Sequence, residues 1–190
     1  MAALISWGTF QVGASEVGLT MEGPLGEKTS FIASARRSYL QFLFSVLELS
    51  FLPTYNDFQV KVKHKINDKN QITFRLGAID NFKLNLDADE TLAQQYQLQL
   101  LPVNEQWNYS VGTKYTHFAK NSYTNVVLSR FMLNNTATKY AANNTENTQL
   151  LDYQSQEIEN KFRVETFTAR MAGALPAALV WKKPNTIPQH

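Results

Sequence analysis

The feature that most constrains the fold is a two-residue alternation on both sides of a short polar turn between Asp57 and Asp80. One alternate set is mainly apolar and consists of Phe58, Val60, Val62, His64 and Ile66, then Ile72, Phe74, Leu76 and Ala78. Such alternation places apolar side chains on one face of a strand and polar side chains on the other. Residues 67–70, Asn-Asp-Lys-Asn, suit a chain reversal because their short side chains bond to their own backbone. The sequence therefore predicts a β-hairpin with one apolar face.

Comparable strand patterns recur along the chain and predict about seven strands. A phase slip near Ser15 in the first of them predicts a β-bulge. Phe42–Leu49 is expected to form a short helix that Pro53 stops, and 88–101 has helix formers without clean periodicity. The predicted strands are 8–22, 29–39, 57–66, 71–80, 106–118, 123–134 and 150–167.

The connections between these strands alternate in length. Short turns are expected at 23–28, 67–70 and 119–122, and long links at 40–57, 81–104 and 135–149. In an up-and-down meander this order puts the short turns at one end and the long loops at the other. Outer-membrane barrels have that asymmetry, and their strands of about 9 to 11 residues present an apolar band outward. We therefore expect an all-β, antiparallel up-and-down meander that is part of an outer-membrane β-barrel.

Four segments carry a resemblance to a known family, from about Gly8 to Thr168. They are GASEVGLTMEGPLGEKTSFIASARRSYLQFLF, LPTYNDFQVKVKHKINDKNQITF, LPVNEQWNYSVGTKYTHF and LLDYQSQEIENKFRVETFT. Together they resemble the early barrel of TonB-dependent outer-membrane receptors, just after the plug domain. The most specific pieces are the Glu22-Gly23-Pro24 turn, the TSFIASARRSY strand and the NDKNQITF hairpin.

The resemblance implies a location in the cell outer membrane and a role in nutrient uptake. Receptors of this family are plugged barrels of about 22 strands that import nutrients with energy delivered by TonB. The implied partners are outer-membrane lipid, the remaining barrel strands and plug, and TonB indirectly through that plug. Residues 1–190 lack a plug, a TonB box, a signal peptide and about two thirds of the strands, so we expect no transport by this chain alone.

The final segment departs from the strand pattern. We divide the chain into 1–170, the partial receptor barrel, and 171–190, a tail without the resemblance that is expected to be disordered. The tail reads MAGALPAALVWKKPNTIPQH, and one set of codons for it permits a strand-like reading in another frame. The abrupt change in composition motivates the hypothesis of a frameshifted or truncated gene.

Composition excludes several classes of function. The 18 basic and 16 acidic residues give a net charge of +2, which does not favour nucleic acid as a partner. The chain has no cysteine, and its three histidines have no metal-ligand spacing. No nucleophilic triad, paired carboxylates or phosphate loop stands at a recognisable spacing, so no enzyme activity, cofactor or catalytic residue is predicted.

Individual residues that suggest a site have simpler explanations. Arg36 and Arg37 suit an anionic ligand, but neighbours on a strand point to opposite faces. His64 lies on the apolar face, where a packed or interfacial role is expected. The acidic loop residues lack the spacing of a calcium loop, and the Asn-x-Ser/Thr matches are common in an Asn-rich chain. The acidic loop residues are Asp87, Asp89 and Glu90, and the Asn-x-Ser/Thr matches begin at Asn108, Asn134 and Asn143.

A second function fits the same pattern. A soluble β-meander of the lipocalin type encloses one small ligand in an apolar interior. In that module Val60, Val62 and Phe74 point inward, whereas in a receptor wall they point outward to lipid. The side on which the apolar residues lie therefore distinguishes the two functions.

Overall fold

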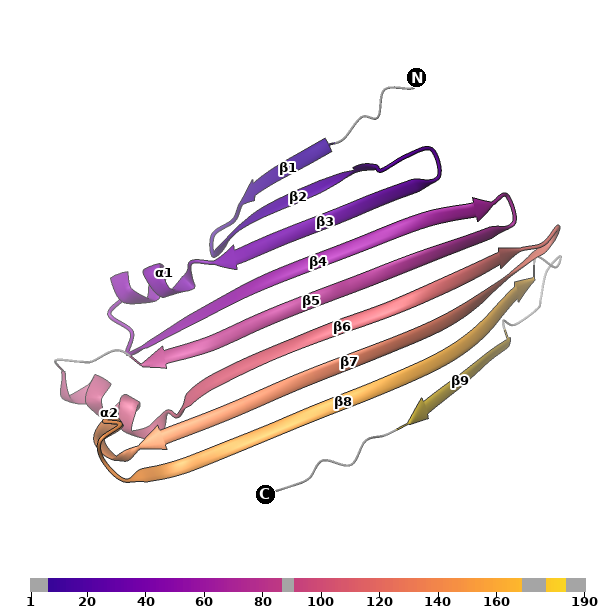
Figure 1. The fold of residues 1–190 in the computed structure, drawn as a ribbon. Helices are drawn as coiled ribbons and strands as arrows, with labels where there is room; N and C mark the ends of the chain where they lie inside the picture. The colour runs from indigo at the N-terminus through magenta and orange to yellow at the C-terminus, as the bar shows by residue number, and fades with distance from the viewer. Residues whose placement is uncertain (1–6, 87–90, 169–176, 184–190) are drawn as a thin grey trace.

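The computed structural model describes residues 7–86, 91–168 and 177–183, which form one antiparallel sheet with two short α-helices (Figure 1). The strands are ordered in the sheet as in the chain, so the fold is the all-β up-and-down meander that the alternation predicted. The strands are β1 Trp7–Val12, β2 Glu16–Pro24, β3 Thr29–Ser38, β4 Phe51–Asn67, β5 Asn70–Leu86, β6 Val103–Phe118, β7 Ser122–Tyr140, β8 Gln149–Thr168 and β9 Ala177–Lys183.

In the described part of the chain the sheet has nine strands, where about seven were predicted. The phase slip near Ser15 is a hairpin turn and not a bulge, because Val12 pairs with Val17 and the Gly13 N–H donates to the Glu16 carbonyl at 2.8 Å. The other additional strand is β9, which lies within the segment predicted to be a disordered tail and pairs with β8. The frameshift hypothesis stays a prediction that the nucleotide sequence tests.

The central strands are longer than their alternation indicated. β4 and β5 have 17 residues each, β7 has 19 and β8 has 20. Helix α1 spans Leu40–Val46, and Glu48 follows it with a φ of 54°. The prediction that Pro53 stops this helix is wrong, because Pro53 lies buried within β4.

The connections lie at opposite ends of the sheet according to their length (Figure 1). The turn end carries the tight turns at 25–28, 68–69 and 119–121. The loop end carries α1, helix α2 (Leu92–Leu100) and the 3-10 turn η1 (Ala141–Asn143), each in a longer connection. The turn at 13–15 is an exception to the predicted asymmetry, since it is short and lies at the loop end, where the Tyr39 N–H donates to the Ser15 carbonyl at 2.9 Å.

Strand register divides the side chains between two faces. Phe31, Val62 and Phe74 are aligned across β3, β4 and β5 on one face, and Lys61 aligns with Arg75 on the other. We call these the apolar face and the polar face. The apolar face includes Phe10, Leu19, Met21, Phe31, Phe58, Val60, Val62, Ile72, Phe74, Leu76, Val111, Tyr115, Val126, Leu128, Phe162 and Val164.

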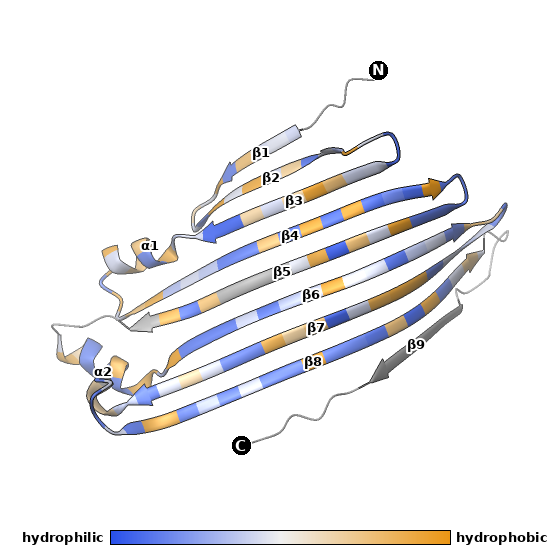
Figure 2. Cartoon of the chain, viewed as in Figure 1, coloured by the Kyte–Doolittle hydropathy of each residue, from blue (hydrophilic) through white to orange (hydrophobic). Residues whose placement is uncertain are grey.

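Hydropathy also changes along the strands, and Figure 2 shows apolar positions interleaved with polar ones mainly toward the turn end. We define the turn half as 58–66, 70–77, 109–118, 122–132 and 158–168. The loop half is 51–57, 78–86, 103–108, 133–140 and 149–157. On the apolar face of the loop half the described side chains of β7 and β8 are mostly polar, and they include Asn134, Thr136, Thr138, Asp152, Gln154 and Gln156.

Candidate functional site

Many apolar side chains of the apolar face are exposed, and several small polar side chains of the polar face are buried. On the apolar face Leu128 is 63% exposed and Phe74 is 42% exposed. On the polar face Thr73 is 2% exposed and Asn125 is 8% exposed. The Thr116 hydroxyl donates to Asn125 Oδ1 at 2.8 Å, so these buried polar groups satisfy each other.

A broad hollow lies on the polar face. It has a volume of about 790 Å³, and its lining extends from Thr20 on β2 to Arg163 on β8. In a flat sheet these strands would lie about 29 Å apart, so one hollow reaches both only if the sheet curves toward its polar face. Two smaller hollows of about 580 and 280 Å³ lie between protruding side chains of the apolar face, and each touches only a few neighbouring strands.

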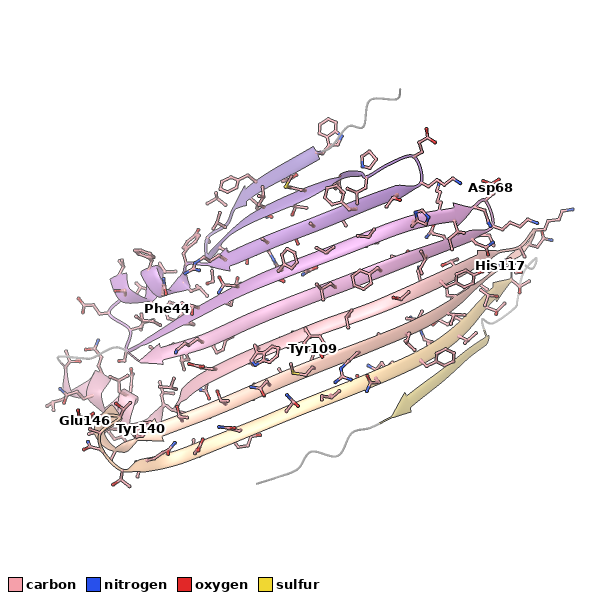
Figure 3. All side chains as sticks on the ribbon, in the orientation of Figure 1. Phe44, Asp68, Tyr109, His117, Tyr140 and Glu146 are labelled. Atoms are coloured by element: carbon pink, nitrogen blue, oxygen red, sulfur yellow. The ribbon has the colours of Figure 1, made fainter. Side chains whose placement is uncertain are left out.

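The apolar face has a polar rim at the turn end. Thr29 Oγ1 and His64 Nδ1 lie 2.8 Å apart, and so do His117 Nδ1 and Asn70 Oδ1. The Tyr115 hydroxyl donates to the same Asn70 oxygen at 2.6 Å. His117 and Asp68 mark this end in Figure 3. His64 therefore pairs with a neighbouring hydroxyl, and within the described residues no cluster of three or more His, Cys, Asp or Glu side chains is suited to a metal ion.

Aromatic residues mark the opposite limit of the apolar face, where the turn half meets the loop half. The rings of Trp107 and Tyr109 lie 6.3 Å apart on β6 (Figure 3 labels Tyr109). Arg130 is a charged exception on this face, and its Nε donates to the Tyr109 hydroxyl at 3.1 Å. From Trp107 to His117 the strand covers about 33 Å, or about 25 Å in height at a tilt of about 40°.

A charge network occupies the polar face near the loop end. Arg36 Nε donates to Asp57 Oδ2 at 2.7 Å, and Arg36 Nη1 lies 3.7 Å from Glu16 Oε1. The Tyr55 hydroxyl donates to Glu16 Oε2 at 2.5 Å. Arg37 points to the other face and donates to Asn56 Oδ1 at 3.2 Å. Two carboxylates thus neutralise the guanidinium of Arg36, and the arginine pair does not form an anion site.

The long connections at the loop end bind one another. Ser50 Oγ donates to Gln97 Oε1 at 3.3 Å, which ties the segment after α1 to α2. Lys139 Nζ donates to the carbonyls of Leu98 and Leu101 at 3.4 and 3.2 Å, so β7 holds the C-terminus of α2. Phe44 of α1 packs edge-on against Phe51 with ring centroids 5.5 Å apart (Figure 3 labels Phe44). These contacts arrange the loops over the end of the sheet.

The remaining residues singled out in the sequence do not assemble. Asn108 lies on β6, Asn134 on β7 and Asn143 in η1. The acidic residues Asp87, Asp89 and Glu90 lie outside the described part of the chain. Neither described helix has the length and apolar character needed to cross a membrane.

The set that sequence reasoning missed is a group of cations in the hollow. Lys61, Arg75 and Lys114 come from β4, β5 and β6 and all line it. Alternation assigned each cation to a polar face and the predicted meander paired these strands, but neither set the register that brings the three cations together. The register of β5 against β6 is that missing information.

Three comparisons with known proteins, against family models, curated proteins and solved structures, find no match to this chain.

Proposed function

We propose that this chain is a section of the barrel wall of an outer-membrane receptor of the TonB-dependent type. Its apolar face contacts lipid, its polar face lines an aqueous interior, and its loop end faces the nutrient. The observation that carries the proposal is the exposed apolar face opposite a hollowed polar face. Contiguous exposed apolar surface of this extent is rare on soluble monomers and typical of protein or membrane contact.

The dimensions of the apolar face support the same function. Its height of about 25 Å between the Trp107 and His117 rims agrees with the apolar band of outer-membrane barrels, which is about 25 Å tall and flanked by aromatic girdles. The strands then continue past the band in the loop half. Such extensions into the external medium accompany the longer loops of these barrels, and the helices and η1 at that end fit the arrangement.

The lipocalin-like alternative requires the opposite curvature. A soluble barrel encloses its apolar face and exposes its polar face. Here a hollow of about 790 Å³ lies among Ser34, Lys61 and Thr73 on the polar face. This curvature favours the receptor wall over the soluble module.

Depth-dependent quenching tests the proposal directly. We would keep Trp107 as the single tryptophan by replacing Trp7 and Trp181 with Phe, and then fold the chain with vesicles that contain brominated lipid. Trp107 lies on the apolar face and is 43% exposed, so strong quenching is expected. The matched control carries Trp107→Phe and Gln59→Trp, which moves the single indole to the polar face. Equal quenching of both proteins, or a chain that stays monomeric in plain buffer without lipid, would contradict the proposal.

The rest of the receptor is part of this proposal. The remaining strands close the barrel, the plug lies within it, and TonB acts through the plug. This chain is then a component of a nutrient transporter and carries no catalytic step.

A further inference from the structure

Three cations lie close together within the hollow of the polar face. Lys61 on β4 is directly opposite Arg75 on β5, and Lys114 on β6 is opposite Thr73, two residues along β5 from Arg75. Neighbouring strands are about 5 Å apart and two residues rise about 7 Å along a strand, so the three backbone positions fall within about 12 Å of one another. Like charges placed directly opposite on a sheet destabilise it. The fold therefore holds these charges together at some cost.

No described carboxylate offsets these three charges. The residues that line the hollow include no Asp or Glu. The ion pairs of the described residues use other cations, namely Arg36, Lys83, Lys161 and Arg163. Arg163, the fourth cation of the lining, has its Nε 3.0 Å from Glu165. Lys61, Arg75 and Lys114 are thus the uncompensated positive charges of the hollow.

The rest of the lining supplies space and hydrogen-bond donors. Ser34, Ser110, Ser129, Thr20 and Thr73 contribute hydroxyls, and Gly77 and Gly112 contribute no side chain beyond hydrogen. A volume of about 790 Å³ falls in the range of about 300 to 1,000 Å³ that is usual for small-molecule sites. Arg75 is exposed and Lys61 and Lys114 are half-buried, so all three side chains remain accessible.

We propose that this hollow binds a small polyanion, a molecule with at least two phosphate or carboxylate groups. One anionic group bridges Lys61 and Arg75, and a second reaches Lys114. The proposal rests on the charges and shape of the hollow and does not require that the opposite face meet lipid.

A small molecule fits this site better than an acidic protein surface. Stable protein interfaces bury about 800 Å² on each partner and need charge over a comparable area. Among the residues that line the hollow, the uncompensated charge is confined to Lys61, Arg75 and Lys114. Around them lie small hydroxylated side chains that form few contacts with a large partner.

Titration of the full chain with defined anions tests the proposal. The protein is folded in zwitterionic micelles, or in buffer if it dissolves there, and tripolyphosphate and citrate are titrated separately by calorimetry at an ionic strength of about 0.1 M. Their two affinities identify whether phosphate or carboxylate groups are preferred. The variant Lys61→Gln/Arg75→Gln/Lys114→Gln should weaken binding of the preferred anion by about tenfold or more, because each charge-assisted hydrogen bond contributes about 1.5 kcal/mol or more.

A charge-matched control separates site binding from general attraction. Lys28→Gln/Lys69→Gln/Lys120→Gln removes three positive charges at the tight turns and leaves the hollow intact. This control should bind within about twofold of the parent protein, since exposed charges more than about 10 Å away are largely screened. Amide exchange of β4 to β6 verifies that both variants are folded, and Arg75→Gln alone replaces the triple variant if it is not.

Three results would overturn the proposal. The first is equal weakening in the hollow variant and the turn control, and the second is the absence of binding of either anion to the parent chain. The third is tight binding of an oligoglutamate peptide with no binding of either small anion, which would assign the hollow to an acidic protein segment.

Discussion

The turn half and the loop half of the long strands share one hydrogen-bonded ladder but differ in their side chains. In the turn half, Leu128 on the apolar face aligns with Phe162 on the next strand. In the loop half, Thr136 on the same face aligns with Gln154. Backbone pairing therefore continues regardless of the medium next to a face. The alternation of apolar and polar side chains, in contrast, depends on that medium. Under the proposed function, this face meets lipid in the turn half and water in the loop half.

The largest expected effect concerns closure of the sheet. The strand order is linear, and within the described residues β1 pairs only with β2 and β9 only with β8. In hydrocarbon each unpaired backbone group costs several kcal/mol, and an odd number of strands would bring β1 and β9 together in parallel. Expressed with a borrowed signal peptide, this chain should show no heat-modifiable migration on a gel. It should also fail to restore nutrient uptake to a receptor-deficient cell.

Restored uptake would mean that these residues form a complete small barrel. Co-expression with the strands and plug that the proposal assigns to the rest of the receptor is the matching positive experiment. Heat-modifiable migration should then appear, because both sheet edges would be paired.

The second prediction separates the halves of the apolar face. Val62→Lys or Leu76→Lys places a charge within the apolar band and should cost about 2 to 4 kcal/mol in a bilayer. Thr138→Lys places the same charge on the same face in the loop half and should cost less than about 1 kcal/mol, since the proposal places that half in water. Unfolding by denaturant from lipid vesicles measures all three. Equal costs in the two halves would contradict the division of this face between lipid and water.

The third prediction concerns the loops. Lys139→Ala removes the ammonium that holds the carbonyls of Leu98 and Leu101 at the end of α2. We expect a loss of about 1 kcal/mol in local stability, and so about fivefold faster amide exchange in α2. Exchange in the turn half should not change. The control is Lys83→Ala, which breaks an exposed 2.5 Å ion pair with Glu105. If this control accelerates amide exchange in α2 equally, the effect is not due to the contact of Lys139 with the end of α2.

The smallest effect is expected on the polar face of the turn half. Lys61→Gln or Arg75→Gln should change the free energy of unfolding by less than about 0.5 kcal/mol, because a hydrated side chain is replaced by another. Removing one of two opposed like charges offsets part of any loss. Denaturant unfolding of these variants and of Val62→Lys, carried out in parallel, compares the losses in unfolding free energy on the two faces. Similar losses on both faces would indicate a sheet buried on both sides.

Much of the fold follows from the sequence alone. The alternation from Phe58 to Leu76 determined which side chains share a face, because a strand has a period of two. The turn residues at 67–70 and 119–122 determined where the chain reverses. All-β class, antiparallel meander order and the grouping of long connections at one end were predicted from these local signals, and the structure has them.

Strand length, register and sheet curvature were decided by the tertiary structure, because local sequence signals do not determine them. In the loop half of β7 no alternation marked residues 135–140 as strand, and only pairing with β6 and β8 extends β7 to Tyr140. Pairing likewise separates β1 from β2, which read as one bulged strand. Spacing along one strand sent Arg36 and Arg37 to opposite faces, but only the register with β4 placed Asp57 against Arg36. The curvature toward the polar face and the cation cluster of the hollow arise from several strands at once, because both depend on which residues stand opposite each other across the sheet.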